Sequence, residues 1–349
     1  MRGDGTEIRS TADVYEALDA PVSSAALAAA LELGLFWTFE DGSRTVRSVA
    51  EELAIPEGRC RFWLATLARL GLLEETEDGF DLSSAGRSVI IAEWSREAWR
   101  YLAIEAREAS PLVVDLARRL GRRGPVTEDP VATMDYVDKL RADPDRARRF
   151  TELLYELHAR LAEAVADTVD LRGARRLLDV GGGSGVISLA LLRRNPDLTA
   201  LVVDIPAVCE AGRAIADRTD EASRISYQTI DYWEEELPGG SDVVMTCDAR
   251  FTPPLLAKIS RALPEGGRYL LVDRSFDTGP SQRAALAPTL FGYSLVDPDH
   301  LFPTIEQVYA DLRAVGLEPA PLVELPRPLW KVIEARKVGL PAAGSDPVG

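Results

Sequence analysis

The chain has 349 residues, of which 46% are hydrophobic, so it is long enough for two domains with a core in each. Its formal net charge of −16 repels phosphate backbones and anionic bilayers, which disfavours binding to nucleic acid or to a membrane surface. Three scattered cysteines without metal-ligand spacing, and the lack of any run of roughly 20 apolar residues or of a signal-like N-terminus, favour a cytoplasmic protein with no metal site and no membrane span.

The first part of the chain predicts helices followed by a hairpin. Residues 12–38 have apolar residues at helical spacing, and a short helix begins at the capping residue Thr45. A longer amphipathic helix is predicted over 56–70, and the turn signal Glu77–Gly79 joins two short strands. Helix, helix and hairpin form a winged-helix pattern, and a further helical stretch is expected from Glu93 to about Gly121.

A winged helix is more often a DNA reader than anything else, so a transcription factor has to be weighed. The presumed recognition helix carries Phe62, Trp63 and several leucines, which leaves little polar surface to read base edges. Acidic residues flank this helix on both sides. The sequence therefore disfavours a DNA-binding role for this region.

The rest of the chain predicts a helical connector and then an α/β domain. A long helix is expected from Asp143 to near Asp167. After Arg175, strand and helix patterns alternate, which predicts a mostly parallel sheet with helices on both faces. The expected strands are 176–180, 200–204, 225–229, 242–246, 268–273 and 329–335.

The most informative motif follows the first of these strands. Asp179, Gly181, Gly183 and Gly185 have the spacing D-x-G-x-G-x-G, which differs from the dinucleotide-binding spacing G-x-G-x-x-G. Glycines allow a tight turn and a close approach of a ligand to the backbone. Asp204 lies about 20 residues downstream, where an acidic residue accepts hydrogen bonds from ribose hydroxyls. A carboxylate at the loop entrance is unfavourable for a pyrophosphate and suits a ligand that carries an ammonium group.

Four blocks of sequence together resemble one enzyme family. They are Leu178–Gly185, Val203–Pro206, Ile230–Trp233 and Leu263–Gly267. In order and spacing they resemble the S-adenosylmethionine-dependent small-molecule O-methyltransferases of the plant type, in the branch that bacteria use for secondary metabolism such as antibiotic biosynthesis. The resemblance covers roughly residues 12–335.

The resemblance implies a domain organisation. The fold class is α/β, with a Rossmann-like doubly wound methyltransferase domain preceded by a mainly helical winged-helix domain that forms a homodimer. Residues 1–110 are expected to be the dimerisation domain and 111–170 a connector that supplies helices to the substrate pocket. Residues 171–337 are expected to bind S-adenosylmethionine, and 338–349 to be a flexible tail.

The cofactor residues follow from the same blocks. Asp204 is expected to bind the ribose, and Asp231 to lie beside the adenine amino group, although Ile230 replaces the family's glycine. A helix cap for Asp204 and a solvated turn for Asp231 are the structural alternatives. The expected cofactor-binding residues are Asp179, Gly181, Gly182, Gly183, Gly185, Asp204, Ile205, Asp231, Tyr232 and Thr246.

The catalytic base departs from the family pattern. The family places a histidine after the fourth strand, whereas the corresponding segment here, Val244–Pro254, has none. The chain has only two histidines, His158 and His300, and His300 lies in a loop that the resemblance places over the substrate pocket. The catalytic candidates are therefore His300, Asp248 and Cys247. A surface role for His300 and a packed helix position for His158 remain the alternatives.

These observations predict a methyltransferase that acts on a small aromatic or polyketide-like natural product. O-methylation is expected first, with C- or N-methylation close behind. The alternative is a family member that binds S-adenosylmethionine but carries out decarboxylation, hydroxylation or pericyclic chemistry, because the usual histidine is absent. The residues expected to contact the substrate are Trp99, Tyr136, Tyr155, His158, Met245 and Phe291, all of which also suit core packing.

Overall fold

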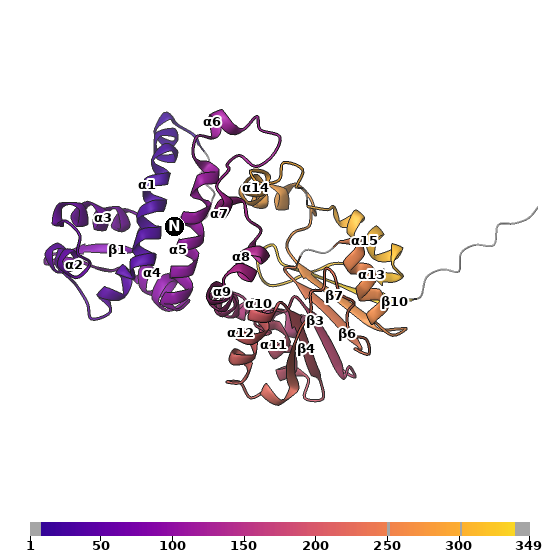
Figure 1. The fold of residues 1–349 in the computed structure, drawn as a ribbon. Helices are drawn as coiled ribbons and strands as arrows, with labels where there is room; N and C mark the ends of the chain where they lie inside the picture. The colour runs from indigo at the N-terminus through magenta and orange to yellow at the C-terminus, as the bar shows by residue number, and fades with distance from the viewer. Residues whose placement is uncertain (1–7, 250–251, 301, 339–349) are drawn as a thin grey trace, which may run out of the picture. The chain divides into compact units, whose positions relative to one another are not determined.

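The computed structural model describes residues 8–249, 252–300 and 302–338. The chain divides into two compact units, residues 1–114 and 115–349, which are coloured from indigo to magenta and from magenta to yellow in Figure 1. The division comes shortly after the predicted boundary at residue 110, where Asp115 has a left-handed φ of +57° and interrupts the expected helix from Glu93 to Gly121. The predicted tail, apart from Val338, lies outside the described residues.

The first unit contains the predicted order of helix, helix and hairpin. Ser10 and Asp13 form a capping box that begins α1, and Gly34 ends this helix with a left-handed φ of +74°. β1 and β2 pair antiparallel, with Thr76 opposite Gly79. The elements are α1 (Thr11–Leu33), a 3-10 helix (Leu35–Phe39), α2 (Val46–Glu52), α3 (Glu57–Arg69), β1 (Leu73–Thr76), β2 (Gly79–Leu82), α4 (Ser84–Gly86), a π-helical turn (Arg87–Ile91) and α5 (Arg96–Val113).

The second unit is built on a central sheet, which confirms the predicted α/β architecture. In the described residues the sheet has eight strands, with β5-β4-β3-β6-β7-β10-β8 as the main order and β9 paired to β10. β3 to β7 are parallel, and β10 runs antiparallel to β7. The strands are β3 (Arg176–Val180), β4 (Thr199–Asp204), β5 (Ile225–Thr229), β6 (Val243–Cys247), β7 (Arg268–Asp273), β8 (Leu317–Pro319), β9 (Val323–Glu324) and β10 (Lys331–Lys337).

Helices cover both faces of this sheet. Leu177 and Leu178 are neighbours on β3 but belong to different hydrophobic clusters, because side chains alternate along a strand. One cluster includes α10, α11 and α12, and the other includes α13 and α15. The helices are α6 (Leu116–Arg119), α7 (Pro130–Thr133), α8 (Tyr136–Ala142), α9 (Pro144–Leu157), α10 (Ala159–Thr168), α11 (Val186–Arg194), α12 (Pro206–Ala216), a 3-10 helix (Ala222–Arg224), α13 (Pro253–Ala262), α14 (Pro280–Ser294) and α15 (Ile305–Ala314).

The long helix expected from Asp143 to near Asp167 is in fact two helices. α9 ends at Leu157 and α10 begins at Ala159, and His158 between them has φ −93° and ψ 2°. The prediction of one helix was wrong at this point because apolar spacing continues through the break and gives no sign of it. His158 therefore lies at a junction between two helices.

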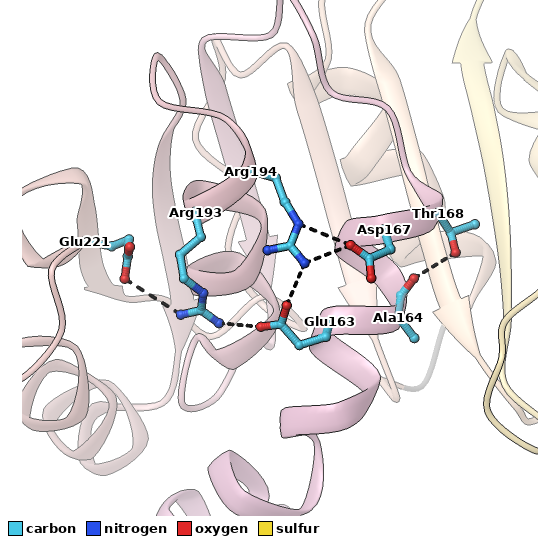
Figure 2. Close-up of polar contacts among 7 residues, drawn as sticks. All are labelled: Glu163, Ala164, Asp167, Thr168, Arg193, Arg194 and Glu221. Atoms are coloured by element: carbon cyan, nitrogen blue, oxygen red, sulfur yellow. Dashed lines mark hydrogen bonds and ion pairs between the residues drawn. The ribbon is translucent and has the colours of Figure 1, made fainter.

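An ion network ties α10 to α11 (Figure 2). Arg194 donates to Glu163 at 2.9 Å and to Asp167 at 2.8 Å. Arg193 donates to Glu163 at 2.8 Å and lies 3.7 Å from Glu221. These pairs join the helix that follows His158 to the helix that follows the glycine motif.

The strand order determines where a ligand binds. β4 lies on one side of β3 and β6 on the other, so the order reverses between β3 and β6. In parallel sheets of this kind, the crevice beyond the carboxyl ends of the strands at the reversal is the binding site. The segments after β3, β4, β6 and β7 therefore bound the candidate site. No helix in the described part of the chain is long and apolar enough to cross a membrane.

Candidate functional site

The glycine turn after β3 presents its backbone to open space. Gly181, Gly183 and Gly185 have φ of +67°, +57° and +75°, a left-handed conformation that favours glycine. A Cβ added at Gly182 would lie 2.4 Å from the Asp179 carboxyl carbon, so only glycine fits there. A Cβ added at Gly183 would meet no described atom within 4 Å, which leaves this face of the turn accessible to a ligand.

Asp179 lies inside this turn and is almost completely buried, with 1% of its surface exposed. Its Oδ2 accepts a hydrogen bond from the Ser188 hydroxyl at 2.6 Å, and Oδ1 meets no hydrogen-bond donor among the described residues. Burial raises the pKa of Asp179 to about 7; Ser188 opposes the rise and the charge of Asp204 adds to it. An unpartnered buried carboxylate oxygen fits a cationic ligand, in particular an ammonium group.

Asp204 ends β4 and faces the same turn. Its Oδ2 accepts a hydrogen bond from the Gly183 amide at 3.0 Å, and its Oδ1 accepts one from the Ile205 amide at 2.8 Å. Burial raises its pKa to about 6. The N-cap residue of α12 is Ile205, whose amide donates to Asp204, so the observed contacts of the Asp204 carboxylate are to backbone amides. Ile205 is buried against α8 and α9 in a small apolar cluster.

Asp231 and Tyr232 follow β5, and Tyr232 lies beside the turn. Asp231 forms an ion pair with Arg141 at 2.6 Å and accepts a bond from the Trp233 amide at 3.2 Å. Tyr232 is 9% exposed, and its hydroxyl lies 3.2 Å from the position of a Cβ built on Gly181. The structure thus brings Tyr232 to the glycine turn.

Thr246 and Met245 are core residues, which corrects the expectation that they line the site. The Thr246 side chain is buried and shares a hydrogen bond of 2.6 Å with the Tyr269 hydroxyl. Met245 is fully buried in the hydrophobic cluster on the opposite face of the sheet. The physical reason is that β6 is an interior strand covered by helices on both faces, so only residues beyond its end reach the crevice.

Asp248 lies in the segment that follows β6, next to His158 in space. His158 Nε2 lies 3.9 Å from Asp248 Oδ2, and Arg274 Nε lies 4.0 Å from Asp248 Oδ1. The His158 ring packs edge-on against Trp330 with 5.6 Å between ring centroids, and the Arg274 guanidinium lies 5.5 Å from the centroid of the same indole. Asp248 has a left-handed φ of +50°, an uncommon conformation for a residue with a side chain.

The charges at this edge influence one another. Burial lowers the pKa of His158, Asp248 raises it and Arg274 lowers it further. Burial also raises the pKa of the Cys247 thiol, and the charges of Asp248, Asp179 and Asp273 add to this effect. Asp273 is buried at the end of β7, and its pKa is raised to about 6, by burial first and by Asp248 second. The carboxyl ends of β3, β6 and β7 are therefore electrostatically coupled.

His300 contacts a different set of residues. Its ring lies 4.8 Å from the ring of Tyr293 and 5.6 Å from that of Phe302, and its Nε2 is buried without a hydrogen-bond partner among the described residues. Its backbone amide donates to Asp297 O at 3.0 Å. The contacts described for Cys247 and Asp248 do not include His300, so the structure groups Asp248 with His158 instead.

The predicted aromatic substrate contacts are dispersed. Tyr136 on α8 is half exposed and lies 5.9 Å from Phe150, and Phe291 on α14 is 48% exposed. Tyr155 packs against the core cluster that includes α10 and α11. Trp99 belongs to the first unit, where its indole donates to Ile90 O at 2.9 Å and packs against the core of that unit.

Arg274 and Trp330 are site residues that the sequence reasoning did not identify. Arg274 directly follows the predicted strand 268–273, so the rule that ligands bind at carboxyl ends of strands was a usable signal. Trp330 precedes the antiparallel strand β10 and offered no such signal. No group of three or more His, Cys, Asp or Glu side chains suited to a metal ion occurs in residues 8–249, 252–300 and 302–338.

Comparison with known proteins finds similarity to methyltransferases. Residues 132–291 match the family of O-methyltransferase domains. A 3-hydroxy-5-methyl-1-naphthoate 3-O-methyltransferase of Streptomyces sahachiroi is 28% identical over 271 residues, covering 75% of this chain and 77% of the relative. The N,N-dimethyltransferase OxyT of Streptomyces rimosus is 28% identical over 302 residues, covering 83% of this chain and 86% of the relative.

Solved structures share the fold. The mitomycin 7-O-methyltransferase MmcR superposes with a TM-score of 0.81 at 22% identity, covering 93% of this chain and 97% of MmcR. PigF with SAH superposes with a TM-score of 0.80 at 20% identity, covering 94% and 100% of the two chains. Residues 132–291 thus match the O-methyltransferase domain family, and together with the curated relatives this match indicates a methyltransferase that uses S-adenosylmethionine.

Proposed function

We propose that the turn Gly181–Gly185, with Asp179 and Asp204, holds S-adenosylmethionine for transfer of its methyl group to a small aromatic or polyketide-like acceptor. The observation that carries this proposal is the buried Asp179 oxygen without a partner, beside a backbone face at Gly183 that is open. The open backbone suits close approach of an adenosyl group, and the carboxylate suits its ammonium group.

The side chains around the turn have separate roles in this proposal. Asp204 accepts hydrogen bonds from the ribose hydroxyls while it fixes the Gly183 amide. Tyr232 borders the nucleoside, with Ile205 and Asp231 on the same side of the site. When bound, the cofactor supplies a sulfonium-activated methyl group whose leaving group needs no acid, so the protein has to orient the acceptor and accept its proton.

The acceptor class rests on the relatives. The relative from Streptomyces sahachiroi is named for a hydroxynaphthoate, and OxyT for N,N-dimethylation. We propose O-methylation of a phenolic hydroxyl as the first candidate reaction. N- or C-methylation is the next candidate, because the same methyl group is transferred to a different acceptor atom. Asp248 lies close to His158 and Arg274, at the edge of the sheet where the acceptor has to bind. Cys247, the residue before Asp248, and His300 remain further predicted catalytic residues.

A second function keeps the cofactor but not the transfer. The observation that favours it is the absence of a histidine in the segment Val244–Pro254. In that case the bound sulfonium acts as a fixed positive charge during decarboxylation, hydroxylation or pericyclic chemistry, and no methyl group moves.

The first unit supports a homodimer through a winged-helix-like domain. Tyr15, Leu18 and Val22 lie on one stripe of α1 and are 69%, 70% and 69% exposed, and Phe62 on α3 is 73% exposed. An exposed apolar stripe such as the one on α1 is typical of protein interfaces. Replacing Leu18 by Glu is expected to convert a dimer to a monomer in analytical ultracentrifugation, and an unchanged sedimentation coefficient contradicts this interface.

We also propose a reducing cytoplasm as the site of action. Cys60, Cys209 and Cys247 are all free thiols in the structure, and two of them are buried. Unpaired cysteines persist where the thiol pool is reduced.

The deciding experiment uses methyl-labelled S-adenosylmethionine. The purified protein is incubated with this donor and with 3-hydroxy-5-methyl-1-naphthoate, a matched amine and a matched carboxylic acid. Label in the hydroxyl product together with S-adenosylhomocysteine supports O-methyl transfer. Binding of S-adenosylmethionine by calorimetry without label transfer, but with loss of the acid's carboxyl group, favours the second function. Absence of binding contradicts both.

A further inference from the structure

The junction of α9 and α10 places an imidazole at the carboxyl edge of the sheet. His158 comes from this junction, Asp248 from the end of β6, Arg274 from the end of β7 and Trp330 from the start of β10. Four segments far apart in the sequence therefore meet at one point. From the sequence, His158 was expected to contact the substrate, with a packed helix position as the alternative.

Backbone strain is concentrated around the same point. The described residues include four non-glycine positions with positive φ, and two of them are Asp248 at +50° and Leu329 at +69°. Asp248 lies beside His158, and Leu329 directly precedes the Trp330 indole that packs against it. Non-glycine residues in this conformation cluster at functional sites, where the surrounding structure compensates for their cost.

The His158 ring is packed in place, but its Nε2 is not hydrogen-bonded to Asp248. Trp330 contacts it edge-on, and only 13% of the His158 side chain is exposed. The distance of 3.9 Å from Nε2 to Asp248 is longer than a hydrogen bond, so Nε2 remains available for a proton from elsewhere. Asp248 is 31% exposed and gives the pair an open side.

One cavity has Trp330 in its wall, whereas His158 and Asp248 do not line it. Its volume is about 630 Å³, which suits a small ligand, and its wall includes Gln282, Leu329, Trp330 and Lys331.

We propose that His158 accepts the proton of the acceptor hydroxyl, with Asp248 as its charge partner and Arg274 and Trp330 holding the pair in place. This inference rests on the proposed O-methyl transfer. The O–H bond of the acceptor breaks and its proton goes to His158 Nε2. The oxygen uses that electron pair to bond the methyl carbon, while the pair of the methyl–sulfur bond goes to sulfur. Asp248 stabilises the imidazolium that results.

The charged groups around His158 determine how it titrates. Burial favours the neutral imidazole, Asp248 favours the charged form, and Arg274 favours the neutral form. Glu156 and Arg160 flank His158 along its own helices. The neutral ring is the form that a base requires before reaction.

Histidine titration by NMR tests the pair without any acceptor. The full chain has only two histidines, so a sample labelled at histidine gives two ring signals, and the His300→Gln variant assigns them. Asp248→Asn is expected to lower the titration midpoint of His158 by about one pH unit or more, and Arg274→Gln to raise it. Asparagine tolerates the left-handed backbone at 248, so this variant keeps the local geometry. An unchanged His158 midpoint in Asp248→Asn overturns the proposal.

Kinetics with 3-hydroxy-5-methyl-1-naphthoate test the proton transfer itself. His158→Gln is expected to lower kcat by about 100-fold or more at pH 7, with little change in KM and with unchanged affinity for S-adenosylhomocysteine. His300→Gln examines the competing residue, and a loss of kcat confined to that variant overturns the proposal. If the unmodified chain binds S-adenosylmethionine but transfers no label, the proposed function fails. The histidine titration still tests the interaction of His158 with Asp248 in that case.

Discussion

Two regions at one edge of the sheet are built in different ways. The turn after β3 is fixed by short hydrogen bonds to two carboxylates: Asp204 accepts from the Gly183 and Ile205 amides at 3.0 Å and 2.8 Å, and Asp179 accepts from the Ser188 hydroxyl at 2.6 Å. The region after β6 and β7 is assembled from side chains of separate segments, and its ion pairs span 3.9 Å and 4.0 Å. A rigid backbone site suits one invariant ligand, whereas a looser arrangement of side chains suits acceptors that differ among relatives.

The sharpest test of this comparison is a bulky side chain at Gly183. Gly183→Val is expected to weaken S-adenosylmethionine binding by about 100-fold or more, because the branched side chain fills the open face of the turn. The matched control is Gly266→Val, since Gly266 also has a positive φ, of +75°, and nothing within 4 Å of an added Cβ. Both variants should lose similar stability, about 1 to 2 kcal/mol, in thermal unfolding. Equal ligand affinity in the two variants, measured by calorimetry, contradicts the assigned site.

A smaller effect is expected from removing one carboxylate of the backbone site. Asp204→Ala should weaken S-adenosylmethionine binding by about 10- to 100-fold, because it removes a charged acceptor and releases the Gly183 amide. Asp197→Ala serves as the control, because that carboxylate is 78% exposed and lies outside the turn. Calorimetry that finds the two variants alike contradicts a ribose-binding role for Asp204.

The smallest expected effect is a pH dependence of the same site. Burial raises the pKa of Asp179 to about 7 in the folded protein, above its ordinary value, so the protonated carboxyl stabilises the unliganded fold at low pH and this contribution is lost as pH rises toward 7. A cationic ligand prefers the ionised carboxylate. Affinity for S-adenosylmethionine should therefore rise about tenfold from pH 6 to pH 8, and the ligand-induced increase in Tm should grow with it.

The Asp179→Asn variant separates this contribution from the others. Asp204 and Asp273 have pKa values near 6 and add a weaker dependence of the same sign at lower pH. In Asp179→Asn, the rise in affinity from pH 6 to pH 8 should shrink to about twofold, the change expected from a carboxyl with the pKa of Asp204. A tenfold rise that persists in this variant shows that another group carries the dependence.

The two regions also differ in how far the sequence determines them. Each expected strand of the central sheet occurs within two residues of its predicted bounds. For β3, β4, β6 and β7 the reason is that buried parallel strands are mostly apolar runs. The turn at Gly181–Gly185 was predictable because neighbouring residues carry its geometry. The position of His158 opposite Asp248 was not, because it depends on a helix break without a sequence signal and on packing between segments some 90 residues apart, as 158 and 248 are. Met245 and Thr246 were misplaced for a related reason: adjacency to a site residue along a strand does not bring a side chain to the site.

The ion network between α10 and α11 has a mechanical consequence. α10 starts directly after His158, and α11 starts directly after Gly185, so Glu163, Asp167, Arg193 and Arg194 couple the two helices on which the donor and acceptor regions depend (Figure 2). A displacement of one helix along its axis is resisted by charge pairs on the other. These charge pairs add to the apolar packing of α10 against α11 in fixing the two helices relative to each other.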